Sequence, residues 1–287
     1  MKAILVGHGA MGTKHFNRLS ALGLSFEAVL DSTEDLNRFT ASLPSLSKSD
    51  TLVVIASPAS THASHASFFL KQGFSVFIEK PIATSAIEAR ELLSIKKPSQ
   101  ALFVGHSERY SPGFQLFQKE FQKKISSIET LRFTRCHPYS PRGRDVNVAL
   151  DLLVHDLDCF FSLFPKENQK SFEIIDSNLS ADQDEASLKI KQPIHSNHAL
   201  IIDFYVNRNA PFSERKIELF DNQNNIIKTF SFLDAQDPIK DTLFYEYEAL
   251  FNAIQMPDSS IEKERLESAC LAVETALKIK TNPSEFL

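Results

Sequence analysis

The chain has 287 residues, of which 43% are hydrophobic and 23% are charged, a composition typical of ordinary globular proteins. Its formal net charge of −5 leaves no basic footprint and argues against general nucleic-acid binding. No apolar run approaches the ~18 residues that a membrane-spanning helix needs. The three cysteines, Cys136, Cys159 and Cys270, lack the spacing of a zinc site or a disulfide framework. We therefore expect a cytoplasmic protein, kept reduced, without a metal site and without membrane or nucleic-acid partners.

The first third of the chain alternates short apolar runs with segments of helical period. The runs show little alternation, which is typical of strands covered on both faces in a parallel sheet. Strand, helix and strand in repetition predict a doubly wound α/β domain. The expected strands are residues 2–7, 26–31, 51–57, 74–80 and 101–106, and the expected helices are residues 11–23, 61–73 and 84–97.

The pattern changes after about residue 125. A strand at 128–136 and an apolar helix within 146–164 precede five candidate strands, at residues 171–180, 186–191, 199–206, 215–220 and 226–232. Helices at 241–255 and 262–280 close the chain. We expect a Rossmann domain at 1–123 and, at 124–287, an α+β domain with an open, mostly antiparallel sheet. The C-terminal helices can pack back on the first domain.

The stretch between the first strand and the first helix contains G-x-G-x-x-G, formed by Gly7, Gly9 and Gly12. Gly7 permits a tight turn, Gly9 lets backbone approach a pyrophosphate, and Gly12 allows close helix–strand packing. The diphosphate then rests on the helix N-terminus, where Ala10 and Met11 lie. The motif predicts a dinucleotide site; the alternative is a glycine turn with a capping acid elsewhere.

Asp31 ends the second strand, at the position where an acid can take the ribose hydroxyls of NAD. Ser32 and Thr33 follow it and offer no positive charge for a 2′-phosphate. We therefore expect NAD in preference to NADP.

Two further stretches follow the third and fourth strands, at the strand ends where open α/β sheets bind ligands. Pro81 biases Lys80 towards an extended backbone, so that its ammonium could point over the nicotinamide; the alternative is a solvated surface charge. His62 is expected to hydrogen-bond beside the cofactor, because the pairs His62/His65 and His195/His198 lack a third metal ligand. The residues expected at the cofactor from these stretches are Ser57, Pro58, His62, Glu79, Lys80 and Pro81.

The apolar run 146–164 contains Asp151 and His155, which are four residues apart and would stack on one face of a regular helix. An isolated pair of this kind can simply satisfy itself in a core. The motifs elsewhere in the chain favour a functional pair instead. They occur in the order glycine fingerprint, acid after the second strand, S-P…H, E-K-P and D-x-x-x-H. With them, nearly the whole chain resembles the Gfo/Idh/MocA oxidoreductase family.

This resemblance implies an NAD-dependent enzyme acting on a CH-OH group, with Lys80, Asp151 and His155 at the catalytic positions. His155 would accept the hydroxyl proton while hydride leaves the same carbon for the nicotinamide, and imidazole suits this role because its ordinary pKa is about 6.5. Asp151 would orient the imidazole or a neighbouring hydroxyl, and Lys80 would stabilise negative charge on the oxygen. The resemblance also implies a homo-oligomer, either a dimer or a tetramer.

Residues 105–114 and 137–158 resemble more narrowly the branch of this family that acts on nucleotide-linked amino sugars. That likeness implies oxidation of the C3 hydroxyl of UDP-N-acetylglucosamine to a 3-keto sugar, which a transaminase could aminate for lipid A or a surface glycan. The substrate-binding residues it implies are Glu108, Arg109, Tyr110, Arg142 and Arg144, together with Asp151 and His155.

The arginines of this region support an anionic substrate independently. Arg135, Arg142 and Arg144 form a cationic cluster in an acidic protein, and arginine can hold a diphosphate in a planar, bidentate way. They could instead pair with acids such as Asp145 or Glu108. Two other functions stay open: a dehydrogenase of a free sugar or polyol such as inositol, and a non-catalytic NAD-binding regulator. Residues 180–187 suggest a loop without an assigned role.

Overall fold

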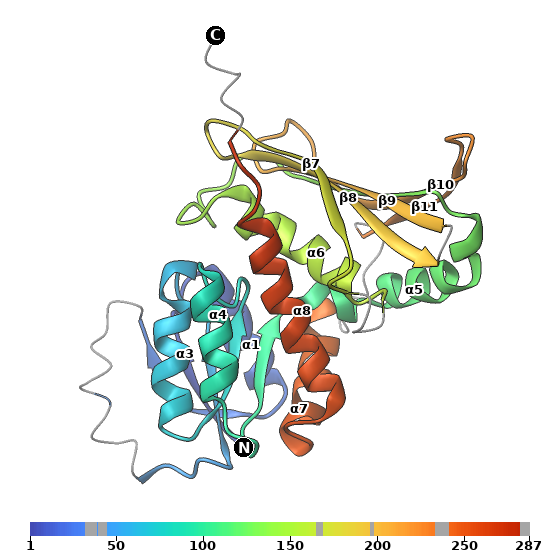
Figure 1. Ribbon diagram of the computed structural model, residues 1–287. Helices are drawn as coiled ribbons and strands as arrows, with labels where there is room; N and C mark the ends of the chain where they lie inside the picture. The colour runs from blue at the N-terminus through green and yellow to red at the C-terminus, as the bar shows by residue number, and fades with distance from the viewer. Residues whose placement is uncertain (32–38, 40–44, 165–168, 196–197, 233–240, 282–287) are drawn as a thin grey trace. The chain divides into compact units, whose positions relative to one another are not determined.

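The computed structural model describes residues 1–31, 39, 45–164, 169–195, 198–232 and 241–281. The chain divides into two compact units (Figure 1). Unit 1 comprises Met1–His106 and Glu246–Cys270, and unit 2 comprises Ser107–Tyr245 and Leu271–Leu287. Each unit contains its own sheet. Within the described residues, no helix has both the length and the apolar character required to cross a bilayer.

Unit 1 is built on a parallel sheet with the strand order β2-β1-β3-β4-β5. β1 pairs with β2 and β3, β3 pairs with β4, and β4 pairs with β5, in parallel register throughout. Every residue of β3 is buried, as a continuous apolar run between two covered faces predicts. The predicted doubly wound parallel sheet is therefore confirmed. Its strands are β1 (Lys2–Val6), β2 (Ser25–Leu30), β3 (Thr51–Ile55), β4 (Ser75–Glu79) and β5 (Leu102–Gly105).

The helices of unit 1 come from both ends of the chain. Figure 1 shows the red helix α8 beside the strand β5 at the edge of the sheet. Glu262 of α8 accepts a hydrogen bond from the Leu102 backbone at 3.1 Å, and Glu267 accepts one from Arg90 at 2.6 Å. The helices are α1 (Ala10–Ala21), α3 (His62–Lys71), α4 (Ala86–Ile95), most of α7 (Thr242–Gln255) and the first part of α8 (Ser260–Ala276).

Unit 2 contains a six-stranded sheet with the order β11-β10-β6-β9-β8-β7. β6 and β9 pair in parallel, whereas the other neighbours pair antiparallel. The expected open, mostly antiparallel sheet is confirmed, with this one parallel pair at its centre. Its strands are β6 (Thr130–Cys136), β7 (Glu173–Leu179), β8 (Glu185–His195), β9 (His198–Asn207), β10 (Glu214–Phe220) and β11 (Ile226–Ser231).

The two faces of this sheet differ in character. Helices α5 (Pro112–Lys124) and α6 (Val154–Phe161) lie on the same side of it (Figure 1), where Phe117 meets Phe230 and Phe160 meets Phe204. The opposite face carries paired charges, among them Arg132 beside Asp203. One face therefore supplies the core of the unit and the other is polar.

The sequence pattern missed helix α5. Its start has clear local causes, because the Ser111 side chain accepts a hydrogen bond from the Phe114 backbone and Pro112 occupies the first turn. The buried face of α5 is formed by Phe114, Phe117 and Phe121, which recur every three or four residues.

The helix that contains Asp151 is not regular. Residues Ala149–Leu153 form a π-helix (η5), and the α-helix α6 begins only at Val154. The expectation of one continuous helix with a period of 3.6 was therefore wrong for this turn. Short π-helical turns occur frequently at functional sites, because the wide turn changes the direction in which side chains leave the helix.

Candidate active site

The glycine-rich loop joins β1 to α1, and its glycines are required for different reasons. Gly7 has a φ of +89°, and a Cβ there would lie 2.5 Å from the backbone nitrogen of Ser57. A Cβ on Gly12 would lie 2.0 Å from the Gly7 carbonyl oxygen, whereas one on Gly9 would meet nothing within 4 Å. Packing inside the unit thus fixes Gly7 and Gly12. Gly9 leaves the start of α1 open, as the approach of a pyrophosphate requires.

The other residues predicted around this loop lie beside it in the chain and in space. Ala10, which is exposed, and Met11, which is half-buried, open α1. The Gly7 backbone donates to the Leu30 carbonyl at 2.7 Å, which brings the end of β2, and with it the exposed Asp31, next to the loop. Ser32 and Thr33 lie outside the described residues.

The loops after β3 and β4 are joined by His62. Its Nδ1 lies 2.8 Å from the Pro81 carbonyl oxygen, and its Nε2 lies 2.8 Å from the Ser57 carbonyl oxygen. Burial lowers the pKa of His62 despite these two carbonyl contacts, so a neutral ring donates to one carbonyl at a time. Three predicted cofactor-side residues are therefore brought together, while Pro58 next to them is exposed. Because β1 and β3 are neighbours at the switch point of the sheet, this is where such folds bind dinucleotides.

Glu79, the residue before Lys80, belongs to a buried hydrogen-bond network. Glu79 is 8% exposed, and its Oε1 lies 2.8 Å from Nε2 of His15, while Nδ1 of His15 lies 2.7 Å from the Tyr247 hydroxyl. Burial by itself would raise the pKa of Glu79, but the hydrogen bond and charge of His15, with Lys80 adding to them, hold that pKa below its ordinary value. Glu79 is thus a buried carboxylate held by its partners rather than a group open to ligands.

Lys80 follows this carboxylate at the end of β4. Its backbone nitrogen donates to Oε2 of Glu79 at 3.1 Å, its side chain is half-buried, and its peptide bond to Pro81 is cis. The network therefore fixes the backbone from which the Lys80 ammonium extends.

In unit 2, Asp151 lies in the π-helix and His155 lies in the first turn of α6. Asp151 is buried, at 8% exposure, and His155 is half-buried. The Asp151 carboxylate faces Gly143, which has a φ of +70°, and a Cβ on Gly143 would lie 2.5 Å from Oδ2 of Asp151. The loop that carries Arg142 and Arg144 is therefore packed directly against the predicted catalytic carboxylate.

Glu108, Arg109 and Arg135 belong to buried ion pairs. Arg135 is 3% exposed and is bound by Asp156 at 2.7 Å and by Glu108 at 3.0 Å, so its inclusion in an anion-binding cluster was wrong. The alternative of pairing with Glu108 is confirmed for this arginine. Arg109 makes a bidentate pair with Asp158, at 2.9 and 2.8 Å. Tyr110, the next residue in the sequence, is also buried. Substrate contacts of Glu108, Arg109 and Tyr110 stay predictions.

Arg142 and Arg144 have different surroundings. Nη1 of Arg144 lies 2.5 Å from each carboxylate oxygen of Asp184, and the guanidinium lies 4.6 Å from the centre of the Tyr139 ring. The Arg142 side chain is exposed and makes no ion pair with any residue that the structure describes. Arg142 is therefore the arginine of this loop whose charge is available to a ligand.

Sequence reasoning missed three residues that hold these sites together: His15, Tyr247 and Arg208. For His15 a signal was present, because it shares the buried stripe of α1 with Gly12 and Leu19 at helical spacing. Tyr247 and Arg208 have no comparable local signal, since their partners lie far away in the sequence.

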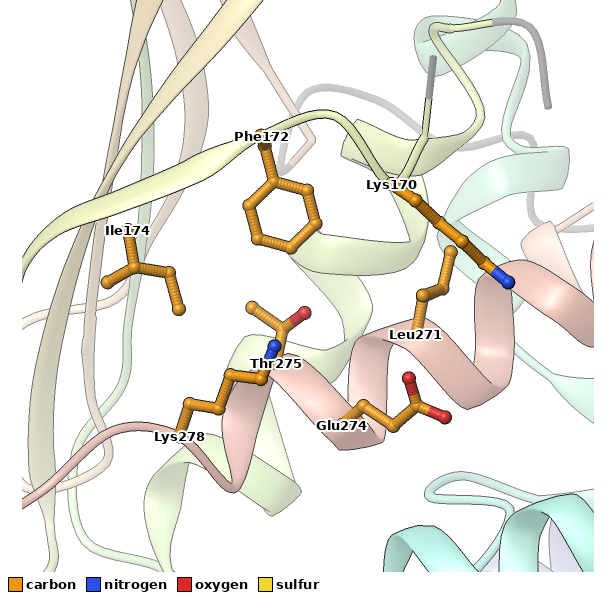
Figure 2. A pocket seen from close by; sticks show the side chains of 7 residues that line it. All are labelled: Lys170, Phe172, Ile174, Leu271, Glu274, Thr275 and Lys278. Atoms are coloured by element: carbon orange, nitrogen blue, oxygen red, sulfur yellow. The ribbon is translucent and has the colours of Figure 1, made fainter. Parts of the chain in front are cut away.

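Unit 2 also contains a pocket of about 480 Å³. Figure 2 shows the ring of Phe172 and the side chain of Ile174 beside residues of the last turns of α8. None of the predicted site residues lines it. Its lining is Lys170, Phe172, Ile174, Leu271, Glu274, Thr275 and Lys278.

Comparison with known proteins identifies the first unit. Residues 1–106 match the Gfo/Idh/MocA family model, described as an oxidoreductase family with an NAD-binding Rossmann fold. The chain is 28% identical over 167 residues to a UDP-N-acetylglucosamine 3-dehydrogenase from Acidithiobacillus ferrooxidans, which covers 55% of this chain and 52% of that protein. This alignment therefore spans about half the length of the relative.

Further relatives agree with that match. An inositol 2-dehydrogenase from Rhizobium meliloti is 27% identical over 231 residues, covering 74% of this chain and 70% of that protein. The solved Acidithiobacillus ferrooxidans enzyme superimposes with a TM-score of 0.71 and 21% identity over 97% of each chain. GenD2 from gentamicin A biosynthesis, solved in complex with NAD, gives a TM-score of 0.74 and 17% identity over 97% of this chain and 93% of that one.

At these identities the solved structures show the shared fold, and the family match over residues 1–106 is to an oxidoreductase family. For residues 1–106, the match agrees with the predicted family and with an NAD-binding Rossmann fold. Residues 1–106 are therefore a domain of the Gfo/Idh/MocA oxidoreductase family, with its NAD-binding Rossmann fold.

Proposed function

We propose that the protein oxidises the C3 hydroxyl of UDP-N-acetylglucosamine to a 3-keto sugar, with NAD as the hydride acceptor. The product is a ketone, and a transaminase could convert it to an amine for lipid A or another surface glycan. The proposal includes a cytoplasmic location and a dimer or tetramer of this chain. It draws support from the similarity to the UDP-N-acetylglucosamine 3-dehydrogenase and from the residues of unit 2.

The observation that carries the proposal is the packing of the Asp151 carboxylate against the loop of Arg142 and Arg144. The segment from Arg142 to His155 then carries both the Asp151 carboxylate, four residues before His155, and the exposed guanidinium of Arg142. His155 would take the hydroxyl proton, which is a step worth about 10²–10⁴-fold in rate when the base is well placed. Lys80 would stabilise the developing negative charge on the oxygen.

NAD, when bound, supplies the electron-pair acceptor of the reaction. The residues that would hold it are the open N-terminus of α1 at Gly9, Asp31 for the ribose, and the loops tied by His62. The absence of side-chain obstruction at Gly9, together with the packing constraints on Gly7 and Gly12, fits a bound diphosphate.

The test is a coupled assay of NADH formation with UDP-N-acetylglucosamine, with a transaminase removing the ketone. N-acetylglucosamine and myo-inositol serve as comparison substrates. We expect turnover with the nucleotide sugar only. Absence of turnover with it, even when product is removed, contradicts the proposed substrate.

Arg142→Gln tests the diphosphate contact. Hydrogen bonds to charged groups contribute about 1.5–3 kcal/mol, so we expect the KM for UDP-N-acetylglucosamine to rise about tenfold or more. Arg132→Gln is the matched control, because Arg132 is a half-exposed arginine of the same unit, on the polar face of its sheet. Arg144 is unsuitable for this test, since its removal would also break the pair with Asp184.

The second candidate is a dehydrogenase of a free polyol such as inositol. It is favoured by the Rhizobium meliloti inositol 2-dehydrogenase, whose alignment covers more of this chain. In that case Arg142→Gln leaves turnover intact and myo-inositol is the better substrate. A third possibility, a non-catalytic NAD-binding regulator, predicts that Lys80→Ala and His155→Ala keep the biological function while NAD still binds.

A further inference from the structure

Arg208 follows β9 directly and is almost completely buried, at 4% exposure. A buried guanidinium is costly unless its donors find acceptors, and this one finds them in three segments of unit 2. Of its five acceptors, two are backbone carbonyls of the loop after β6, one is a backbone carbonyl of the turn before β8, and two are carboxylates. The acceptors are Gly143 O at 2.5 Å, Val146 O at 2.9 Å, Gln183 O at 3.4 Å, Asp184 Oδ1 at 2.8 Å and Asp151 Oδ2 at 3.5 Å.

Asp184 connects this guanidinium to a second one. Its carboxylate also accepts from Arg144, and the Arg208 backbone nitrogen donates to its carbonyl oxygen at 3.0 Å. Burial alone would raise the pKa of Asp184, but the hydrogen bonds from Arg144 and Arg208 outweigh it and lower that pKa. Residues 180–187, whose role the sequence left open, thus supply the carboxylate that holds two arginines.

The contacts of Arg208 converge on the predicted catalytic carboxylate. Gly143 and Val146, whose carbonyls it holds, flank Arg144, and the missing side chain of Gly143 leaves the space that Asp151 occupies. The backbone of Val148 donates to Gln183 at 3.0 Å, so the entry to the π-helix is tied to the same turn. At 3.5 Å the Arg208–Asp151 contact is an ion pair rather than a strong hydrogen bond.

We propose that Arg208, supported by Asp184, is a positioning residue for the reaction. It fixes the Asp151 carboxylate and the loop that presents Arg142, so that both reach the substrate in one geometry. This inference rests on the proposed function for its kinetic consequence. It adds a residue that acts through Asp151 and the loop and does not itself touch the substrate.

Lysine cannot replace arginine in this role. A guanidinium presents five donors in a rigid plane, whereas an ammonium is a compact point charge with three. Arg208→Lys keeps the positive charge beside Asp151 and Asp184. A single ammonium cannot hold the Gly143 and Val146 carbonyls, which Nη1 of Arg208 contacts, together with the Asp184 carboxylate, which Nε contacts. The variant therefore separates positioning from charge.

The experiment compares Arg208→Lys with the control Arg132→Lys in the full chain. The measurements are the melting temperature, the Kd for NAD, the steady-state kinetics with UDP-N-acetylglucosamine, and hydrogen exchange of the 140–153 segment. Displacement of supporting groups typically costs 10–100-fold in activity. For Arg208→Lys we expect kcat to fall by about that factor, the Kd for NAD to stay within about twofold, and the 140–153 amides to exchange faster. The control is expected to match the wild type.

Asp184→Asn provides a second variant should Arg208→Lys fold poorly. It leaves Arg208 in place but weakens its anchor, and a smaller kcat loss in the same direction is expected. Wild-type kinetics together with unchanged exchange in either folded variant overturns the inference. The exchange measurement needs no substrate, so it still decides the positioning claim when the wild type fails to oxidise UDP-N-acetylglucosamine, a result that contradicts the proposed substrate alone.

Discussion

The imidazole of His15 and the carboxylate of Glu79 lie 2.8 Å apart although 64 positions separate them in the sequence. His15 belongs to α1, the helix that the glycine loop opens, and Glu79 is the last residue of β4. The contact therefore links the predicted diphosphate site to the backbone of Lys80. The Tyr247 hydroxyl, from a distant part of the sequence, completes the network on the other ring nitrogen.

Glu79→Gln should lower the free energy of unfolding in a pH-dependent way. The folded state holds the pKa of Glu79 below its ordinary value, so the unfolded state binds more protons as the pH falls. The contribution is fully present above the unfolded pKa of about 4.3 and is lost as the pH falls through the folded value. We expect a loss of about 1–3 kcal/mol at pH 7, shrinking in acid, measured by urea unfolding from pH 3 to 8. A difference that does not change with pH would contradict this account.

Gly9→Ala and Gly12→Ala should separate binding from stability. A methyl group on Gly9 meets no protein atom but projects where a diphosphate would approach, so we expect wild-type unfolding and a Kd for NAD raised about tenfold or more. A methyl group on Gly12 collides with the Gly7 carbonyl, so overpacking should cost about 1–3 kcal/mol of stability. Denaturant unfolding and calorimetric titration with NAD check both. If both variants lose only stability, the glycine loop is not the cofactor site.

His155→Ala should abolish most turnover while NAD still binds. Loss of a positioned general base costs about 10²–10⁴-fold in kcat, and His155 lies in unit 2, away in sequence from the glycine loop. His198→Ala is the control, because His198 is a half-buried histidine of the same unit whose Nε2 contacts the Ile128 carbonyl. Equal activity of the two variants would remove His155 from the mechanism.

The thiols should be unreactive in the folded protein. Cys136, Cys159 and Cys270 are buried thiols that form no disulfide with any residue the structure describes. Burial, with the charge of Glu214, raises the pKa of Cys136 to about 11, and burial also raises that of Cys159. Since the thiolate is the reactive form, a thiol titration with a disulfide reagent should give no fast reaction at pH 7 and three equivalents in denaturant. Fast labelling of the native protein would show that a cysteine is more accessible than its burial indicates.

The parallel sheet and the glycine loop could be predicted from the sequence because their signals are local. Continuous apolar runs identify strands covered on both faces, and the glycine spacing reports a turn that only glycine can form. The geometry agrees in detail: Gly7 has the positive φ, Gly12 the close contact and Gly9 the open space.

The charges of unit 2 could not be assigned in the same way. An arginine looks the same in the sequence whether it binds a ligand or a buried acid, and the partner decides between the two. Arg135 pairs with Asp156 and Arg144 pairs with Asp184, each across a distance in sequence that no local pattern encodes. Only Arg142 kept the exposure that the cluster was expected to have.

The wide turn at Ala149–Leu153 makes the number of residues in this segment as important as their identity. Each residue advances a regular helix by roughly 100°, so deleting one residue here would let the segment rewind into an ordinary helix. His155 and the apolar side chains after it would then face a different direction from Asp151. A variant that keeps Asp151 and His155 but shortens the segment between them would therefore retain both groups and lose their relative orientation.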